Sequence, residues 1–311
     1  MKSSTLHKNY KDHLSGFHEW DQLEHAEEWM LFVKNMGKHL CIDEVAISQG
    51  ELYTVVSNAE AKTQKGSLVA MIRGTNSADI EKILMKIPEG QRARVETITA
   101  DLSESMQQAA STCFFNALLT GDRFHVQQLV SDAVQEERMK HRRAAIKSEN
   151  QAVKQARAEG RTHQSQRLAN GDTHKELLAR SRYLLFKASG KWTSSQKQRA
   201  SILFKEYPDL EKAYHLSMHF RGIYEHAIDQ QDALERLASW YKKVEEKGFE
   251  SFMTASETIS VHEKAVLQYF TTRRTNALAE AFNSKIKTFR SIFRGVSDLP
   301  FFLFRVANIF A

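Results

Sequence analysis

The spacing of apolar residues along the chain changes period several times. Residues 1–38 are mostly polar, with Trp20, Trp29 and Phe32 at roughly helical spacing, so we predict a helical N-terminal segment. Short apolar and β-branched runs follow, separated by turn signals at Gly50 and at 62–66. These runs predict a meander of three antiparallel strands, at residues 39–47, 51–57 and 67–73.

Helical and extended patterns then alternate. The sequence predicts helices over 77–86 and 103–112, and strands over 94–100 and 116–120, before a turn leads into another helix at 121–126. The resulting order, β-β-β-α-β-α-β-α, is that of the RNase H-like fold, in which the first and fourth strands are neighbours. We therefore predict an α/β fold with a mixed five-stranded sheet flanked by helices.

Extended runs are absent from about residue 127 to 265, where helical patterns predominate. The stretch from 136 to 199 holds 16 Lys and Arg residues against six Asp and Glu residues, a local basic excess. A large all-helical insertion therefore precedes the last helices of the core. We predict four parts: a helical segment at 1–38, the first part of an RNase H-like core at 39–134, the helical insertion at 135–270, and the closing helices of the core at 271–311.

Composition narrows the function classes. The chain has 311 residues and a formal charge of +6, which is compatible with a polyanionic partner. Its two cysteines provide neither a disulfide framework nor a thiolate zinc cluster. The aromatic-rich tail at 299–310 is too short to span a bilayer and contains Arg305, so it predicts a helix docked on the core. We expect a cytoplasmic protein with no membrane partner.

Three acidic residues stand out because their surroundings disfavour a bare charge. Asp43 lies in the middle of an apolar strand, Asp101 ends the fourth predicted strand, and Glu280 lies on a basic amphipathic helix. A carboxylate inside a strand is destabilising unless something binds it. Converging carboxylates without thiols or paired histidines suit a hard, oxygen-seeking cation such as Mg²⁺. Together they point to two-metal phosphodiester chemistry.

Each acid also has a purely structural explanation. Asp43 could face water from an edge strand, although a lone polar residue is unusual on a face shared with Val45 and Ile47. Asp101 could cap the following helix or shape a turn. Glu280 could belong to a solvated helix face. The sequence alone leaves these alternatives open.

The helix that carries Glu280 has a polar and an apolar face. The polar face holds Asn276, Glu280, Asn283 and Lys287, and the opposite face carries Ala277, Leu278, Ala281, Phe282 and Ile286. In the functional interpretation Glu280 points into a cleft, and Lys287 and Arg290 continue along it to meet DNA phosphate. The preceding pair, Arg273 and Arg274, is either a solvated surface or a further phosphate contact.

Asp122 and His125 follow the fifth predicted strand. They are candidates for groups that support the metal ligands, but Asp122 could equally cap a helix and His125 could be structural. Other chemistries lack their signatures. The chain has no G-x-S-x-G elbow, no phosphate-binding Walker loop, no G-x-G-x-x-G after a strand and no H-E-x-x-H pair.

Several segments, in order, resemble the ISL-three group of bacterial insertion-sequence transposases, which have a DDE catalytic domain. The first acid lies in Leu40-Cys-Ile-Asp-Glu44, followed by Gly50-Glu-Leu-Tyr-Thr54 and Lys65-Gly-Ser-Leu-Val-Ala-Met71. Asp122-Arg-Phe-His-Val126 resembles the group's D-x-F-H signature, and Arg182-Tyr-Leu-Leu-Phe-Lys187 its R-x-L-L-x-K segment. Thr275-Asn-Ala-Leu-Ala-Glu280, continued to Lys287, resembles its last catalytic helix, and Arg294-Gly-Val loosely resembles a following turn.

The resemblance, over about residues 35–311, implies a DDE transposase catalytic subunit. Asp43, Asp101 and Glu280 would hold two Mg²⁺ ions, or Mn²⁺ in their place, for DNA strand cleavage and strand transfer at insertion-sequence ends during transposition. The DNA-binding residues would be Arg273, Arg274, Asn276, Lys287 and Arg290. Asp122 and His125 would support the metal ligands without binding the metal themselves. The partners would be double-stranded transposon-end and target DNA, with the chain acting as a homodimer on DNA, associated with the bacterial nucleoid.

The chain departs from this group in one respect. Members usually begin with a cysteine-rich zinc-binding segment and a helix-turn-helix, and this sequence has no such cysteines ahead of its first core strand. We expect that a separate polypeptide supplies this module or that the copy is truncated. Two other functions stay open at this stage: an RNase H-like nuclease or resolvase without strand transfer, and a non-catalytic DNA-binding remnant.

Overall fold

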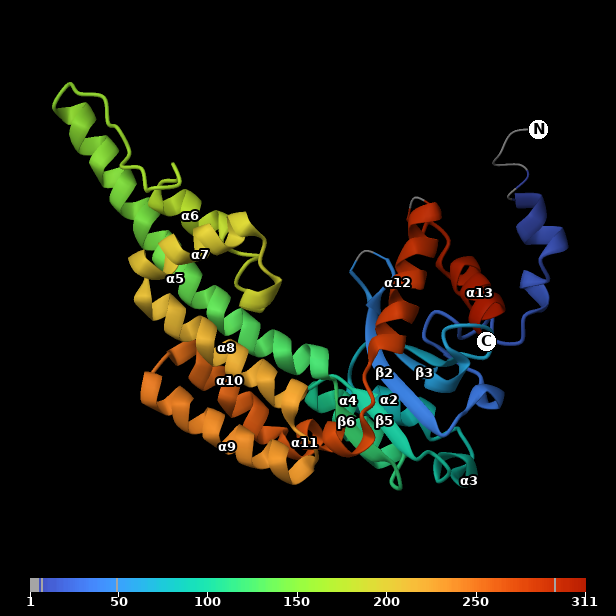
Figure 1. Ribbon diagram of the computed structural model, residues 1–311. Coiled ribbons are helices and arrows are strands. Elements are labelled where there is room, and N and C mark those ends of the chain that lie inside the picture. The colour runs from blue at the N-terminus through green and yellow to red at the C-terminus, as the bar shows by residue number, and fades with distance from the viewer. Residues whose placement is uncertain (1–5, 7, 49, 294) are drawn as a thin grey trace. The chain divides into compact units, whose positions relative to one another are not determined.

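The computed structural model describes residues 6, 8–48, 50–293 and 295–311. Contacts divide the chain into two compact units (Figure 1). The first consists of residues 1–124 and 264–311, and the second of residues 125–263. The sequence analysis predicted a helical insertion at 135–270 within an α/β core, and the second compact unit covers residues 125–263. Arg294, part of the loosely matching turn, lies outside the described residues.

A six-stranded mixed sheet forms the centre of the first unit. Its strands, in chain order, are β1 Trp29–Leu31, β2 His39–Ala46, β3 Leu52–Asn58, β4 Leu68–Arg73, β5 Thr97–Ala100 and β6 Leu118–Gly121. Their order across the sheet is β1-β4-β3-β2-β5-β6. The meander β2-β3-β4 is antiparallel, whereas β2, β5 and β6 are parallel to one another. The first and fourth predicted strands, β2 and β5, are therefore neighbours as expected.

The edge strand β1 corrects two predictions, a five-stranded sheet and a helix around Trp29. Trp29–Leu31 pairs antiparallel with the end of β4, and 3-10 and π turns replace a regular helix in the described residues before it. A three-residue strand is too short to show a period of two, so the aromatic spacing was misleading. The short elements around it are η1 Tyr10–Leu14, η2 Phe17–Glu19, η3 Val33–Asn35 and, after β3, η4 Ala59–Ala61.

Helices cover both faces of this sheet, which gives the first unit three layers. Alternation along β2 sends Leu40 and Ile42 to one core, with the apolar side chains of α2 Ser77–Leu84 and α4 Glu104–Cys113. Val45 and Ile47 have the opposite parity along the chain. They pack on the other side of the sheet with α12 Ala277–Ile292 and α13 Leu299–Phe310. The C-terminal helix docks on the core as predicted, and α3 Glu89–Arg92 precedes β5.

The second unit is helical. It holds all but the first two residues of the long helix α5 Arg123–Ala158. The elements that follow are α6 His174–Arg180, η5 Ser189–Lys191, α7 Ser194–Glu206, α8 Pro208–His226, α9 Gln230–Lys247 and α10 Glu250–Val261. Trp240, Phe220 and Phe252 are fully buried in it. The chain turns at His262 before α11 Glu263–Thr272, most of which belongs to the first unit. No helix among the described residues is long and apolar enough to cross a membrane.

Candidate active site

Three aspartates lie at one level of the parallel strands. Ile42 of β2 pairs with Ala100 of β5, and Ala100 pairs in turn with Gly121 of β6. Asp43, Asp101 and Asp122 are the residues that directly follow these three partners. Because β5 and β6 end here, Asp101 and Asp122 lie at the carboxyl ends of parallel strands, where sites form in α/β sheets. The strand order predicted that Asp43 and Asp101 lie side by side, and Asp122 extends the row.

Asp43 is 7 % exposed, and two groups donate hydrogen bonds to its carboxylate. The backbone N–H of Glu44 donates to Oδ1 over 2.8 Å, and Nδ2 of Asn283 donates to Oδ2 over 2.8 Å. The same Asn283 nitrogen lies 3.1 Å from the carbonyl oxygen of Glu44. Such donors make the burial of an ionised carboxylate tolerable. They also anchor α12 directly over Asp43.

Asp101 shapes the turn into α4, as its structural explanation proposed. Its Oδ1 accepts a hydrogen bond from the backbone N–H of Ser103 over 2.8 Å, and its carbonyl accepts one from Nε2 of Gln107 over 3.0 Å. Ser103 occupies the N-cap position but makes no side-chain cap bond. Asp101 is half-buried, and no hydrogen bond joins its Oδ2 to the residues that the structure describes. The turn role thus uses only one carboxylate oxygen.

Asp122 is almost fully buried at 1 % exposure. Its Oδ1 lies 3.3 Å from the backbone nitrogens of Phe124 and of Asn276, both of which donate. Asn276, the N-cap residue of α12, is 0 % exposed, and neither polar atom of its side chain has a hydrogen-bond partner among the described residues. This burial does not suit the DNA contact that we predicted for Asn276. Asp122 instead fixes the start of α12.

The buried thiol of Cys41 lies near two aspartates of this row, Asp43 and Asp122. The pKa of Cys41 is raised to about 12, first by burial and then by the negative charges of Asp122 and Asp43, whereas a hydrogen bond with the backbone of Ala279 lowers it. Cys41 and Asp43, two residues apart on β2, share the sheet face that α12 covers.

Glu280 is exposed, and it lies on α12 three residues before Asn283. Residues at this spacing are neighbours on a helix, so Glu280 lies about one turn from the side chain that holds Asp43. Among the described residues, however, no three His, Cys, Asp or Glu side chains form a group that could hold a metal ion. That all three predicted ligands converge on one site therefore stays a prediction.

The two faces of α12 differ from the sequence-based assignment. The buried residues are Ala279, Phe282, Asn283 and Ile286, whereas Ala277 and Ala281 are exposed. Asn283 and Asn276 belong to the buried side because each meets an aspartate of the sheet. Asn283 was not among the predicted site residues, although it lies three residues after Glu280 on the predicted polar face, within the segment that resembles the family's last catalytic helix.

The predicted cationic residues lie in different settings. Lys287 is exposed and Arg290 is half-buried, further along α12. Arg273 has a positive φ of 53°, and its guanidinium lies 5.3 Å from the centre of the Phe270 ring. Arg274 is half-buried. The pKa of His39 is lowered mainly by the burial of His39 itself and then by the positive charge of Arg274. These four residues belong to the first unit. His125 is half-buried on α5 and belongs to the helical unit.

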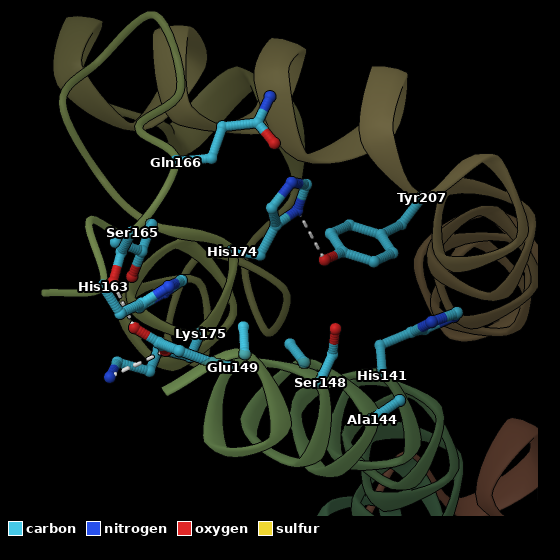
Figure 2. Close-up of a pocket in the computed structure, with 13 residues that line it drawn as sticks. His141, Ala144, Ser148, Glu149, His163, Ser165, Gln166, His174, Lys175 and Tyr207 are labelled. Atoms are coloured by element: carbon cyan, nitrogen blue, oxygen red, sulfur yellow. Dashed lines mark hydrogen bonds and ion pairs between the residues drawn. The ribbon is translucent and has the colours of Figure 1, made fainter. Parts of the chain in front are cut away.

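A separate cavity of about 410 Å³ opens in the helical unit (Figure 2). At one end, Glu149 accepts from Lys175 over 2.8 Å and from the hydroxyl of Ser165. Towards the other end, Nδ1 of His174 lies 2.9 Å from the hydroxyl of Tyr207. The charged groups at this cavity thus have partners within the unit. Nothing in this arrangement resembles the row of aspartates on the sheet.

Residues 40–306 match the family model of the ISL-three group of DDE transposases, which is described as a transposase. The match includes the sheet from Leu40 of β2 to β6 but not β1, together with the aspartate row, the helical unit and α12. No curated protein and no solved structure matches the chain. Since the matched region covers most of the sequence, this chain belongs to the ISL-three family of transposases.

Proposed function

We propose that this chain is the catalytic subunit of a DDE transposase, which cleaves DNA strands at the ends of an insertion sequence and joins them to target DNA. The observation that carries the proposal is the position of Asp43 and Asp101 directly after Ile42 and Ala100, which pair on adjacent parallel strands, with α12, the helix that carries Glu280, hydrogen-bonded to Asp43 through Asn283. Family membership supports it. The strand order, an antiparallel meander followed by two parallel strands, supports an RNase H-like core.

The donor chemistry of the proposed site fits a divalent cation. Asp43, Asp101 and Glu280 offer only carboxylate oxygens, which Mg²⁺ and Mn²⁺ prefer, and the buried Cys41 thiol beside them stays protonated because its pKa is about 12. Two bound ions would activate a water or a DNA 3′-hydroxyl and stabilise the leaving 3′-oxygen. Asn283 fixes the orientation of Asp43 through its hydrogen bond to Oδ2. Lys287, Arg290, Arg273 and Arg274 would bind DNA phosphates.

DNA cleavage by the Asp43→Ala variant tests the proposal. With Mg²⁺ and transposon-end DNA, the variant should lose cleavage and keep or increase DNA binding, because removing an anion reduces repulsion of phosphate. Glu44→Gln is the matched control, since Glu44 is the next residue and is exposed. It should cleave like wild type. A cleavage-competent Asp43→Ala protein would refute the mechanism, and cleavage by wild type without a strand-transfer product would favour a nuclease.

The partners follow from this proposal. The substrate would be double-stranded DNA, transposon end and target, bound by a homodimer in the cytoplasm at the nucleoid. A separate zinc-binding helix-turn-helix protein would supply recognition of the terminal repeats. Adding such a protein, encoded beside this chain, should convert weak, sequence-independent DNA binding into binding specific for the terminal repeat in a gel-retardation assay. Unchanged sequence preference would contradict this part of the proposal.

A further inference from the structure

Three arginines line a cavity of about 550 Å³ in the helical unit. Arg138 and Arg142 lie one turn apart on α5, and Arg182 follows α6. Like charges at this helical spacing repel each other, so their gathering is unfavourable unless an anion offsets it. We call this group, with the cavity that it lines, the arginine pocket.

The guanidinium of Arg138 is held in a fixed position. The residue is 5 % exposed, its Nε donates to Oε1 of Gln135 over 2.7 Å, and its Nη1 donates to the carbonyl of Leu178 over 2.8 Å. Nε2 of Gln135 in turn donates to the carbonyl of Arg182 over 3.2 Å. These bonds link α5 to the segment after α6. They orient the charge of Arg138 without neutralising it.

No carboxylate compensates this charge within the described residues. None of the three arginines forms an ion pair there, although the nearby Arg180 does so with Asp172. Asp132 also lines the cavity, but its Oδ1 accepts a hydrogen bond from Nε2 of Gln128 over 2.7 Å. The Nε of Arg142 is buried, and no described residue offers it a hydrogen-bond partner. An uncompensated buried charge is strongly unfavourable, so binding an anion at this pocket would be favourable.

Electrostatics at Arg138 agree with the geometry. Burial lowers the pKa of Arg138, and the positive charges of Arg142 and Arg182 lower it further. Every cause acts in the same direction, as expected for a cluster of positive charges. Arg182 is exposed, so the cavity can admit a ligand from solvent, and its guanidinium lies 5.5 Å from the ring centre of Tyr183, which is 68 % exposed.

We propose that the arginine pocket binds a phosphate group, and that the phosphate is one of the DNA backbone. Guanidinium forks match the geometry of phosphate oxygens, and a buried, preoriented arginine beside two more accessible ones can contact several of them at once. The exposed ring of Tyr183 beside the pocket favours a nucleic acid over a free anion, because aromatic rings stack on sugars and bases. The choice of DNA rests on the proposed function, whereas the phosphate site itself does not.

Two measurements on the full chain test the proposal. In the first, one DNA duplex is titrated against wild type, Arg138→Gln and Arg182→Gln at several salt concentrations. Each variant should bind about fivefold to tenfold more weakly and reduce the salt slope by about one unit. Arg143→Gln is the control, because Arg143 is exposed on the same helix and does not line the cavity. Its slope and affinity should change less.

The second measurement titrates inorganic phosphate by calorimetry, without DNA. Wild type should bind phosphate and Arg182→Gln should not. Because Arg182 is exposed, this variant keeps the test valid even if Arg138→Gln folds poorly. Phosphate binding with unchanged DNA affinity in both variants would retain the pocket but overturn DNA as the source of the phosphate. No phosphate binding, together with unchanged DNA affinity and slope, would overturn the pocket. The phosphate arm can be interpreted even if the chain fails to cleave DNA.

Discussion

The hydrogen bond from Asn283 to Asp43 makes a quantitative prediction about the candidate site. Replacing Asn283 by Ala removes the donor that lies 2.8 Å from Oδ2 of a carboxylate with 7 % exposure. A hydrogen bond to a charged group contributes about 1.5–3 kcal/mol, and the lost contact with the Glu44 carbonyl adds to this. We therefore expect Asn283→Ala to lower the free energy of unfolding of the α/β unit by about 2–3 kcal/mol.

Urea unfolding followed by circular dichroism measures this loss in the free energy of unfolding. A double-mutant cycle with Asp43→Ala isolates the interaction between Asn283 and Asp43. The cycle should give a coupling free energy of at least about 1 kcal/mol, because the two side chains are in direct contact. Ser284→Ala is a suitable control, since Ser284 is the next residue on α12 and is exposed. Additive effects of Asn283→Ala and Asp43→Ala, or a loss below about 0.5 kcal/mol, would refute the role of Asn283 as the support of Asp43.

Three further predictions concern single residues of the α/β unit. Lys287→Ala should weaken binding to all DNA sequences and reduce the salt slope by about one unit with little cost to stability, and equal slopes would show that Lys287 is only a surface charge. Asp122→Ala should cost about 1–3 kcal/mol in urea unfolding, because two backbone N–H groups lose their acceptor; a neutral variant would contradict this. Burial raises the pKa of Cys41 to about 12 and that of Cys113 to about 11, so both thiols stay protonated at pH 8. Ellman's reagent should then react with neither in the folded chain and with both in denaturant.

The sheet could largely be predicted from the sequence because each strand carries its own signal. Apolar and β-branched runs between turn residues marked five of the six strands, and the strand order placed Asp43 beside Asp101. Alternation along β2 correctly put Asp43 on the face of Val45 and Ile47. Such features depend on residues close in sequence, or on general rules of topology.

The polar contacts of the site could not be predicted in the same way. A helical period alone assigns Asn276 and Asn283 to a solvated face, because the residues that make their burial favourable are distant in sequence. Asp122 lies 154 residues before Asn276, and Asp43 lies 240 residues before Asn283. The arginine pocket was hidden for a related reason: the charge run on α5 predicts a basic surface, and only the folded unit shows that Arg138 is buried.

The most direct test of the central claim locates the metal. Crystals of the full chain grown with transposon-end DNA and Mn²⁺ should show anomalous density at the sheet edge where β5 ends, within coordinating distance of the carboxylates of Asp43, Asp101 and Glu280. Two peaks about 3.5–4 Å apart would match the two-metal mechanism. Peaks only elsewhere on the protein, or none at this edge in a DNA-bound crystal with Mn²⁺ at millimolar concentration, would contradict the account.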